Sequence, residues 1–289
     1  MAYHTDTLTR KAYAKINLGL DVVRRLENGY HEVRMIMQTV GIFDVLTFAV
    51  AESGIRITTD SGELSVNEDN LVYKAARLLM ETCGVKAGIE IHLEKHIPIA
   101  AGMAGGSSDA ATTLLGLNEL FALDLSQEQL RQLGVRIGAD VPYCIMGGTA
   151  LAEGIGEILT SLPPAPRCNV LIARPDIQVS TRYVYEHLDA RETWLHPDID
   201  GMQSAIRGGD LTGITSRLGN VLETVTVERY PVIARIKQEM LSCGALGSLM
   251  SGSGPTVFGI YESSEQAETA CDHLKELGLA GVLSVTQFV

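Results

Sequence analysis

The chain has 289 residues, 46% of them hydrophobic, so it is long enough to bury one large core or two ordinary ones. Its formal charge of −12, with no run of Lys and Arg to offset it, would repel a nucleic-acid backbone. No stretch approaches the roughly eighteen uncharged apolar residues of a membrane span, and the first residues lack the features of a signal peptide. We therefore expect a cytoplasmic protein that binds neither nucleic acid nor membrane.

Cysteine usage agrees with a reducing compartment. The five cysteines are scattered, odd in number and without a Cys-x-x-Cys pair, which favours free thiols over disulfides or structural zinc. They are Cys83, Cys144, Cys168, Cys243 and Cys271.

The N-terminal part of the chain alternates between strand and helix patterns. Apolar residues recur at every second position around residues 16–22, and residues 35–39 and 45–50 form two further extended runs. An apolar face at helical spacing predicts a helix over 68–83, with Asn70 near its start. Strand 89–94 and helix 107–122 follow, and a capping box of Ser126 and Gln129 predicts a helix that ends near residue 137.

The remainder of the chain indicates a second domain. A Gly/Pro-bounded break at 138–142 precedes a strand through Ala150 and Leu151. Residues 163–166 contain three prolines, which neither a helix interior nor a central strand accommodates, so we expect a linker there. We predict an α+β protein with domains at 1–162 and 163–289. The expected elements of the second domain are strand 170–173, helices within 181–240, strand 256–261 and helix 264–277.

A glycine-rich turn joins strand 89–94 to helix 107–122. Residues 98–111 read Pro-Ile-Ala-Ala-Gly-Met-Ala-Gly-Gly-Ser-Ser-Asp-Ala-Ala. Gly102, Gly105 and Gly106 would let the backbone approach a bulky anion and adopt positive φ. Ser107 and Ser108 would lie at the helix start, where unpaired N–H groups favour an anion. The turn therefore predicts a phosphate site, and the alternative is a tight turn with a serine N-cap.

Two better-known phosphate motifs do not fit this turn. A Walker loop requires Lys directly after its last glycine, whereas Gly106 is followed by two serines. A dinucleotide-binding fingerprint differs in glycine spacing and in its position in the chain.

The spacing of the turn resembles the second motif of the GHMP kinases. Residues 12–20 and 244–258 are similar to the first and third motifs of that family, in the correct order. The resemblance implies a ribosomal-protein-S5-like N-terminal domain, a ferredoxin-like C-terminal domain and small-molecule substrates, in a monomer or weak homodimer. It also implies ATP with Mg²⁺ held mainly by phosphates and water, so we assign no metal ligand in the protein.

Carried over residue by residue, the resemblance assigns the ATP site. Asn70 and Lys95 match positions near the adenosine, although Lys95 alone also fits a solvated lysine at a strand end. The loop carries alanines at 100, 101 and 104, and a methionine at 103, where a more glycine-rich sequence is common. The implied phosphate-loop contacts are Pro98, Ala100, Ala101, Gly102, Met103, Ala104, Gly105, Gly106, Ser107 and Ser108.

Lys15 and Asp140 are the predicted catalytic residues. In the family, the lysine of the first motif approaches both the catalytic aspartate and the transferring phosphate, and Asp140 lies in the run expected beside the acceptor hydroxyl. Phosphoryl transfer needs charge neutralisation and an oriented hydroxyl, which these two groups would supply. Without the resemblance, Asp140 is equally well interpreted as a helix N-cap, and Lys15 is better interpreted as a solvent-facing strand residue.

The segment 27–39 is where we expect substrate recognition. Asn28 and Gly29 predict a tight hairpin turn that presents Tyr30 and His31 at its exit, where they would form either a base-binding pair or an ordinary cross-strand pair. The run Gly-Tyr-His followed by Met-Gln-Thr closely resembles the GHMP-family kinases of 4-diphosphocytidyl-2-C-methyl-D-erythritol, which phosphorylate its 2-hydroxyl with ATP in the non-mevalonate isoprenoid pathway.

That resemblance implies the substrate contacts. Tyr30 would stack on cytosine, His31 would hydrogen-bond it, and Asn17 would hold the substrate near Lys15. Tyr185 would close the second face, or Tyr183 if the register is shifted by two. The turn Gly252-Ser253-Gly254 would lie near the substrates, or be a simple tight turn.

Two other functions remain open. One is a GHMP kinase of homoserine, mevalonate or a sugar, and the other is a nucleotide-binding protein without catalysis.

Overall fold

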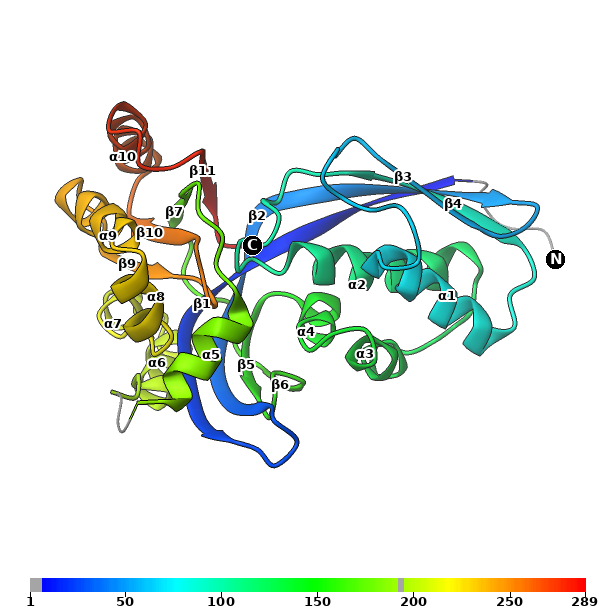
Figure 1. The fold of residues 1–289 in the computed structure, drawn as a ribbon, viewed down its shortest axis with the longest axis horizontal. Coiled ribbons are helices and arrows are strands. Elements are labelled where there is room, and N and C mark those ends of the chain that lie inside the picture. Colours follow the sequence, from blue (N-terminus) through cyan, green and yellow to red (C-terminus); the bar gives the residue numbers. More distant parts are fainter. Residues whose placement is uncertain (1–6, 192–194) are drawn as a thin grey trace. The chain divides into compact units, whose positions relative to one another are not determined.

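The computed structural model describes residues 7–191 and 195–289, which form two compact units (Figure 1). The first unit comprises the chain up to Ala14 together with Ile42–Ile99 and Ala104–Gly147. The second comprises Lys15–Gly41, Ala100–Met103 and Gly148–Val289. The units are therefore built from interleaved segments, and the domain boundary after residue 162 stays a prediction.

Two long strands contribute residues to both units. Strand β1 spans Thr7–Arg25 and β2 spans His31–Ala51, so one strand covers the two separate runs predicted over 35–50. The hairpin between them is confirmed, but it is longer than a two-residue turn. Leu26 N–H donates to the Tyr30 carbonyl at 2.7 Å and Gly29 N–H to the Leu26 carbonyl at 3.0 Å, which encloses three residues. Gly29 has φ +84°, as a three-residue hairpin loop requires.

In the first unit, helices pack on a sheet. Strand β4 (Gly88–Glu94) pairs antiparallel with β2 and parallel with β3 (Ile55–Thr59), so the strands are ordered β3-β4-β2-β1. Helices α1 (Leu71–Cys83) and α2 (Gly105–Leu120) lie along one face of these strands (Figure 1), and α3 (Gln127–Val135) and α4 (Val141–Met146) pack against α2. The buried core includes Phe48, Leu79, Ile91 and Leu114.

Local capping explains where two of these helices begin. Asn70 caps α1, because its Oδ1 accepts from Val72 N–H at 2.9 Å. The predicted capping box of Ser126 and Gln129 is confirmed at the start of α3. Helix α4 was not predicted, although Pro142 stands in its first turn, where proline is tolerated.

In the second unit, a four-stranded sheet carries the ferredoxin-like arrangement. Its strands are β7 (Asn169–Arg174), β9 (Gly247–Met250), β10 (Val257–Tyr261) and β11 (Val282–Gln287), ordered β11-β7-β10-β9 with antiparallel neighbours. Helices α9 (Val232–Ser242) and α10 (Ser264–Glu276) pack on it. Taken in chain order, this is a βαββαβ unit, so the α+β fold predicted for a GHMP kinase is confirmed.

The other elements of the second unit lie outside this sheet. Strand β5 (Thr149–Glu153) pairs with β2 and with β6 (Ile158–Ser161), and β8 (Gly219–Asn220) runs parallel to β1. Strands β3, β6, β8, β9 and β11 were not predicted individually. The region expected to be helical contains α5 (Thr181–Asp189), α6 (Ile199–Arg207), α7 (Leu211–Thr215) and α8 (Glu223–Arg229). None of the helices in the described ranges is both long and apolar enough to cross a bilayer.

Candidate active site

The glycine-rich turn opens directly into α2. The helix begins at Gly105, two residues earlier than predicted, so Gly105 and Gly106 lie in its first turn and do not have positive φ. The left-handed positions are Ala100, Gly102 and Ala104, with φ of 51°, 75° and 56°. The expectation that all three glycines adopt positive φ is therefore wrong for two of them, because the helical register carries Gly105 and Gly106 into the αR region.

The alternative of a serine N-cap is also wrong. Ala104 occupies the N-cap position and no side chain caps the helix. Ser108 instead donates its hydroxyl to the Tyr13 carbonyl at 2.7 Å, and Ser107 lies within the first turn. The first N–H groups of a helix have no intrahelical acceptor, and the N-cap residue Ala104 has no side-chain acceptor to offer them. This helix end therefore offers backbone donors and a positive dipole to an anion.

Within the second unit, the loop segment Ala100–Met103 packs against the turn at 251–254. Ser251 donates its hydroxyl to the Gly102 carbonyl at 2.9 Å, and a Cβ on Gly102 would lie 2.3 Å from the Ser251 carbonyl oxygen. Gly252 and Gly254 have φ of 59° and 89°. Ser253 shares a 2.8 Å hydroxyl hydrogen bond with Thr181. This turn therefore does more than connect β9 to β10.

Lys15 is buried beside the same loop segment. Its backbone N–H donates to the Met103 carbonyl at 3.1 Å, and its ammonium donates to Asn17 Oδ1 at 2.8 Å. Lys15 is 4% exposed and Asn17 is fully buried, so the interpretation of Lys15 as a solvent-facing residue is wrong. The structure thus brings together three predicted site elements, namely the lysine, the asparagine and the loop.

Asp140 occupies the N-cap position of α4 without acting as a cap. Its backbone is αR, with φ −82° and ψ −14°, and its side chain makes no capping hydrogen bond. The interpretation of Asp140 as a residue whose side chain caps the helix is therefore wrong. Asp140 belongs to the first unit and Lys15 to the second, so their pairing stays a prediction.

His31 and Tyr185 lie against each other in the second unit. Their ring centroids are 4.6 Å apart, with an interplanar angle of 33°. His31 Nε2 lies 2.7 Å from Asp189 Oδ1, whereas Tyr30 on the hairpin is 59% exposed. Tyr183 instead stacks on His187, with centroids 3.7 Å apart. Asp189 was not predicted, because no pattern in the sequence links positions so far apart.

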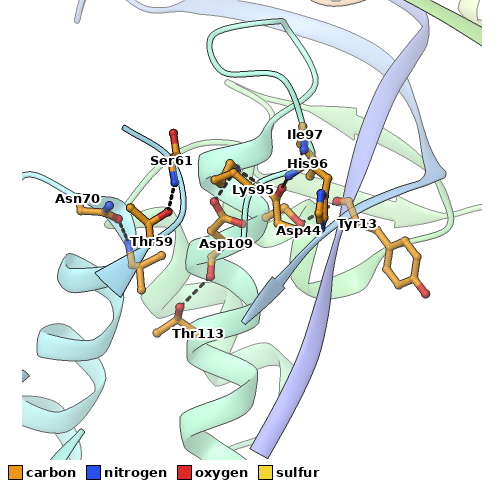
Figure 2. A network of polar contacts seen from close by, with 12 residues as sticks. Tyr13, Asp44, Thr59, Ser61, Asn70, Lys95, His96, Ile97, Asp109 and Thr113 are labelled. Atoms are coloured by element: carbon orange, nitrogen blue, oxygen red, sulfur yellow. Dashed lines mark hydrogen bonds and ion pairs between the residues drawn. The ribbon is translucent and has the colours of Figure 1, made fainter. Parts of the chain in front are cut away.

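The two residues expected near the adenosine have their side chains engaged in the first unit (Figure 2). Asn70 caps α1 and also donates from Nδ2 to the Ser65 carbonyl at 2.7 Å. The Lys95 ammonium contacts Asp44 and lies 2.9 Å from Asp109 Oδ2, with its side chain only 7% exposed. The interpretation of Lys95 as a solvated lysine is therefore wrong, and its two partners were not predicted.

Comparison with known proteins agrees with the resemblance to GHMP kinases. The profile of the GHMP kinases N terminal domain matches residues 70–148, and that of the GHMP kinases C terminal domain matches 202–279. A 4-diphosphocytidyl-2-C-methyl-D-erythritol kinase of Lachnospira eligens is 55% identical over 98% of both chains. The enzyme of that name from Caldicellulosiruptor bescii is 52% identical, over 92% of this chain and 93% of its own.

Solved structures agree in fold. A crystal structure of 4-(cytidine 5'-diphospho)-2C-methyl-D-erythritol kinase aligns with a TM-score of 0.84 and 32% identity, over 97% of this chain and 99% of its own. A homoserine kinase from Cytophaga hutchinsonii aligns with a TM-score of 0.80 at 22% identity, over 100% of this chain and 96% of its own, which shows the fold alone. The chain is therefore an ATP-dependent kinase of the GHMP family, and within it belongs to the family of 4-diphosphocytidyl-2-C-methyl-D-erythritol kinases.

Proposed function

We propose that the chain transfers the terminal phosphoryl group of ATP to the 2-hydroxyl of 4-diphosphocytidyl-2-C-methyl-D-erythritol. The observation that carries this proposal is the hydrogen bond from Lys15 N–H to the Met103 carbonyl, because it fixes a buried lysine beside the phosphate loop. The near full-length similarity to kinases of that name supports the choice of substrate.

Each group has a role that phosphoryl transfer needs. The N-terminal amides of α2 would hold the ATP phosphates, and the Lys15 ammonium would neutralise charge on the migrating group. Asp140 would orient the acceptor hydroxyl and take its proton late, since a loose transition state demands little early deprotonation.

The Mg²⁺ that this transfer requires would be held mainly by the ATP phosphates and by water. Mg²⁺ commonly keeps several waters and binds through substrate phosphates with few protein ligands. It would neutralise charge on the ATP phosphates while the protein residues hold and orient both substrates.

Cytosine recognition follows from the contacts of His31. A carboxylate accepts hydrogen bonds, so Asp189 favours the tautomer with the proton on Nε2. A neutral imidazole of that tautomer presents Nδ1 as an acceptor. The exocyclic amine of cytosine donates a hydrogen bond, whereas uracil has a carbonyl at that position. His31 would therefore select cytosine, and Tyr185, which lies against it, is a better candidate for stacking than Tyr183.

Two finer properties are also proposals. A cytoplasmic location fits an ATP-dependent enzyme in which none of the five cysteines forms a disulfide. The prediction of a monomer or weak homodimer can be checked by sedimentation-velocity ultracentrifugation of the purified chain.

The function can be tested by measuring ADP release with a substrate panel. We expect turnover with 4-diphosphocytidyl-2-C-methyl-D-erythritol and none with mevalonate, homoserine or galactose, while the uridine analogue should react poorly. Lys15→Ala and Asp140→Ala should each lose most of kcat and still bind ATP. Turnover near that of the wild type in either variant would contradict the assigned roles, and turnover of another panel member alone would contradict the substrate.

A further inference from the structure

Three ionisable side chains meet in the interior of the first unit. The side chains of Lys95, Asp44 and Asp109 are 7%, 0% and 3% exposed. Taking a charge out of water costs several kcal/mol unless it is paired and hydrogen-bonded. A buried cluster of this kind therefore stabilises one arrangement of the segments that carry it, because any other arrangement leaves a charge unpaired.

The segments joined by this cluster are the two ends of the phosphate loop. Asp44, on β2, accepts at Oδ1 from the backbone N–H groups of His96 at 2.6 Å and Ile97 at 2.8 Å, and at Oδ2 from the Lys95 ammonium. The same ammonium donates to Asp109 Oδ2 at 2.9 Å, on the second turn of α2 (Figure 2). Residues 95–97 lead into the loop and α2 leaves it, so one ammonium ties its entry to its exit.

Packing at Gly105 shows how closely the two ends approach. A Cβ there would lie 3.0 Å from Ile97 Cγ2 and 3.3 Å from Lys95 Nζ. Contacts at 3.0–3.4 Å are tighter than most Cβ contacts, so a side chain at Gly105 would press on the cluster. The first turn of α2, whose amides face the nucleotide in the proposed function, therefore rests on the entry segment.

The charge balance of the cluster agrees with a positioning role. Burial raises the pKa of Asp109 to about 8, although Lys95 opposes the shift. Burial lowers the pKa of Lys95, but the Asp109 and Asp44 carboxylates more than offset this and raise it overall. Asp109 Oδ1 is buried with no hydrogen-bonding partner among the described residues. A protonated Asp109 would keep the bond to Lys95 without placing a second full negative charge near the phosphates.

We propose that Asp44, Lys95 and Asp109 are positioning residues that hold the phosphate loop in its ATP-binding conformation. This inference rests on the proposed function only in that the loop binds ATP. The Lys95 side chain would accordingly act on the nucleotide through the loop and the helix.

Hydrogen–deuterium exchange of the full chain tests the proposal without any substrate. In Lys95→Met, which keeps the side-chain length and removes the charge, amides of residues 98–108 should exchange at least roughly tenfold faster than in the wild type. Asp109→Ala should speed exchange in the same way. Asp109→Asn retains an acceptor for Lys95, so its amides at 98–108 should exchange at the rate of the wild type. Asp60→Asn is the matched control, because exposed Asp60 accepts from the Lys95 backbone N–H at 2.9 Å and from the Thr59 hydroxyl at 3.5 Å, whereas the ammonium contacts Asp44 and Asp109.

Steady-state kinetics give an independent readout. Lys95→Met should raise the KM for ATP roughly tenfold and leave the KM for the cytidine substrate within about twofold. An unchanged exchange rate of residues 98–108 in Lys95→Met and Asp109→Ala, or an equal rise in both KM values, would overturn the proposal. If the wild type turned over no substrate, the proposed function would fail, but the exchange experiment would still decide the inference. If Lys95→Met did not fold, Asp109→Ala against Asp109→Asn would decide it.

Discussion

His31 has two neighbours that fix its imidazole before any substrate arrives, namely the Asp189 carboxylate and the Tyr185 ring. Removing the imidazole in His31→Ala takes away a hydrogen bond and part of a stacking surface, while the phosphate loop keeps its contacts. Stacking on one aromatic ring is worth about 1–3 kcal/mol in nucleic-acid binders, so we expect the KM for the cytidine substrate to rise about tenfold or more. The KM for ATP should stay unchanged.

The matched control for that measurement is His187→Ala. His187 also stacks on a tyrosine of α5, but its partner is Tyr183. Steady-state kinetics with both substrates varied should therefore show a selective effect only for His31. Equal increases in the two KM values of His31→Ala, or the same selective effect in His187→Ala, would contradict cytosine recognition by His31.

Asp109 makes a separate prediction about pH. Burial raises the pKa of Asp109 in the folded chain to about 8, above the ordinary value of 3.8, so folding favours its protonated form between these pH values. This contribution to the free energy of unfolding is complete below pH 4 and is lost as the pH rises towards 8. The two charged groups that face Asp109, Lys95 and Asp44, remain in place in Asp109→Asn, whose amide cannot titrate.

Urea unfolding at several pH values measures this effect. The stability of the wild type relative to Asp109→Asn should decrease steadily from pH 5 to pH 8, a window set by the two pKa values. The opposite slope, or a constant difference between the two proteins, would show that Asp109 is ionised throughout.

At the scale of elements, local signals in the sequence predicted local structure well. The capping box at Ser126 is complete within four residues, and the alternating pattern of β1 reports the two faces of a strand directly. Strand β8 has two residues and is a strand only because Gly19 and Leu20 lie opposite it, so no periodicity marks it. The partners of Lys95 were missed for the same reason, since they lie 51 and 14 positions away.

The glycine loop shows how a functional prediction can rest on a partly wrong local one. The phosphate site was expected because three glycines would bend the backbone, yet two of the three left-handed residues are Ala100 and Ala104. Sequence composition does not report φ, and the helix register decides which residues have to bend. What the sequence predicted correctly was the arrangement of a helix N-terminus preceded by a glycine-containing turn.

Ala104→Gly tests the strain in this loop. An L-residue in the left-handed region is disfavoured by roughly 1–2 kcal/mol, which glycine avoids, while the flexibility of glycine in the unfolded chain offsets about 0.5–1 kcal/mol. We therefore expect Ala104→Gly to keep or raise the melting temperature. Ala101→Gly should lower it, because Ala101 is buried and lacks positive φ. Calorimetry on both variants would refute this explanation if Ala104→Gly were the less stable.

At the scale of the whole molecule, chain order says little about which segments share a compact unit. Lys15 and the loop Ala100–Met103 belong with the C-terminal half of the chain, although both precede the proline-rich segment 163–166. Periodicity alone supports an α+β protein with two domains, and the ferredoxin-like strand order was implied only by the family resemblance. The order β11-β7-β10-β9 depends on pairings between strands far apart in the chain, and these leave no local trace.

Gly102 tests whether such a long-range contact is essential. It packs against a turn 149 positions later, has φ +75°, and would place a Cβ 2.3 Å from the Ser251 carbonyl oxygen. Because the obstructing atom is backbone and the conformation is left-handed, alanine there can fit only if the loop separates from the turn. We expect Gly102→Ala to lower the melting temperature and to raise the KM values for both substrates, since the loop and the turn would both move. The comparison for stability is Gly106→Ala, where φ is not positive and the nearest atom is Leu71 Cδ1 at 3.4 Å, so the helix should tolerate the side chain. If the melting temperature of Gly102→Ala were equal to or above that of Gly106→Ala, and both KM values were unchanged, the contact between loop and turn would not be needed to form the site.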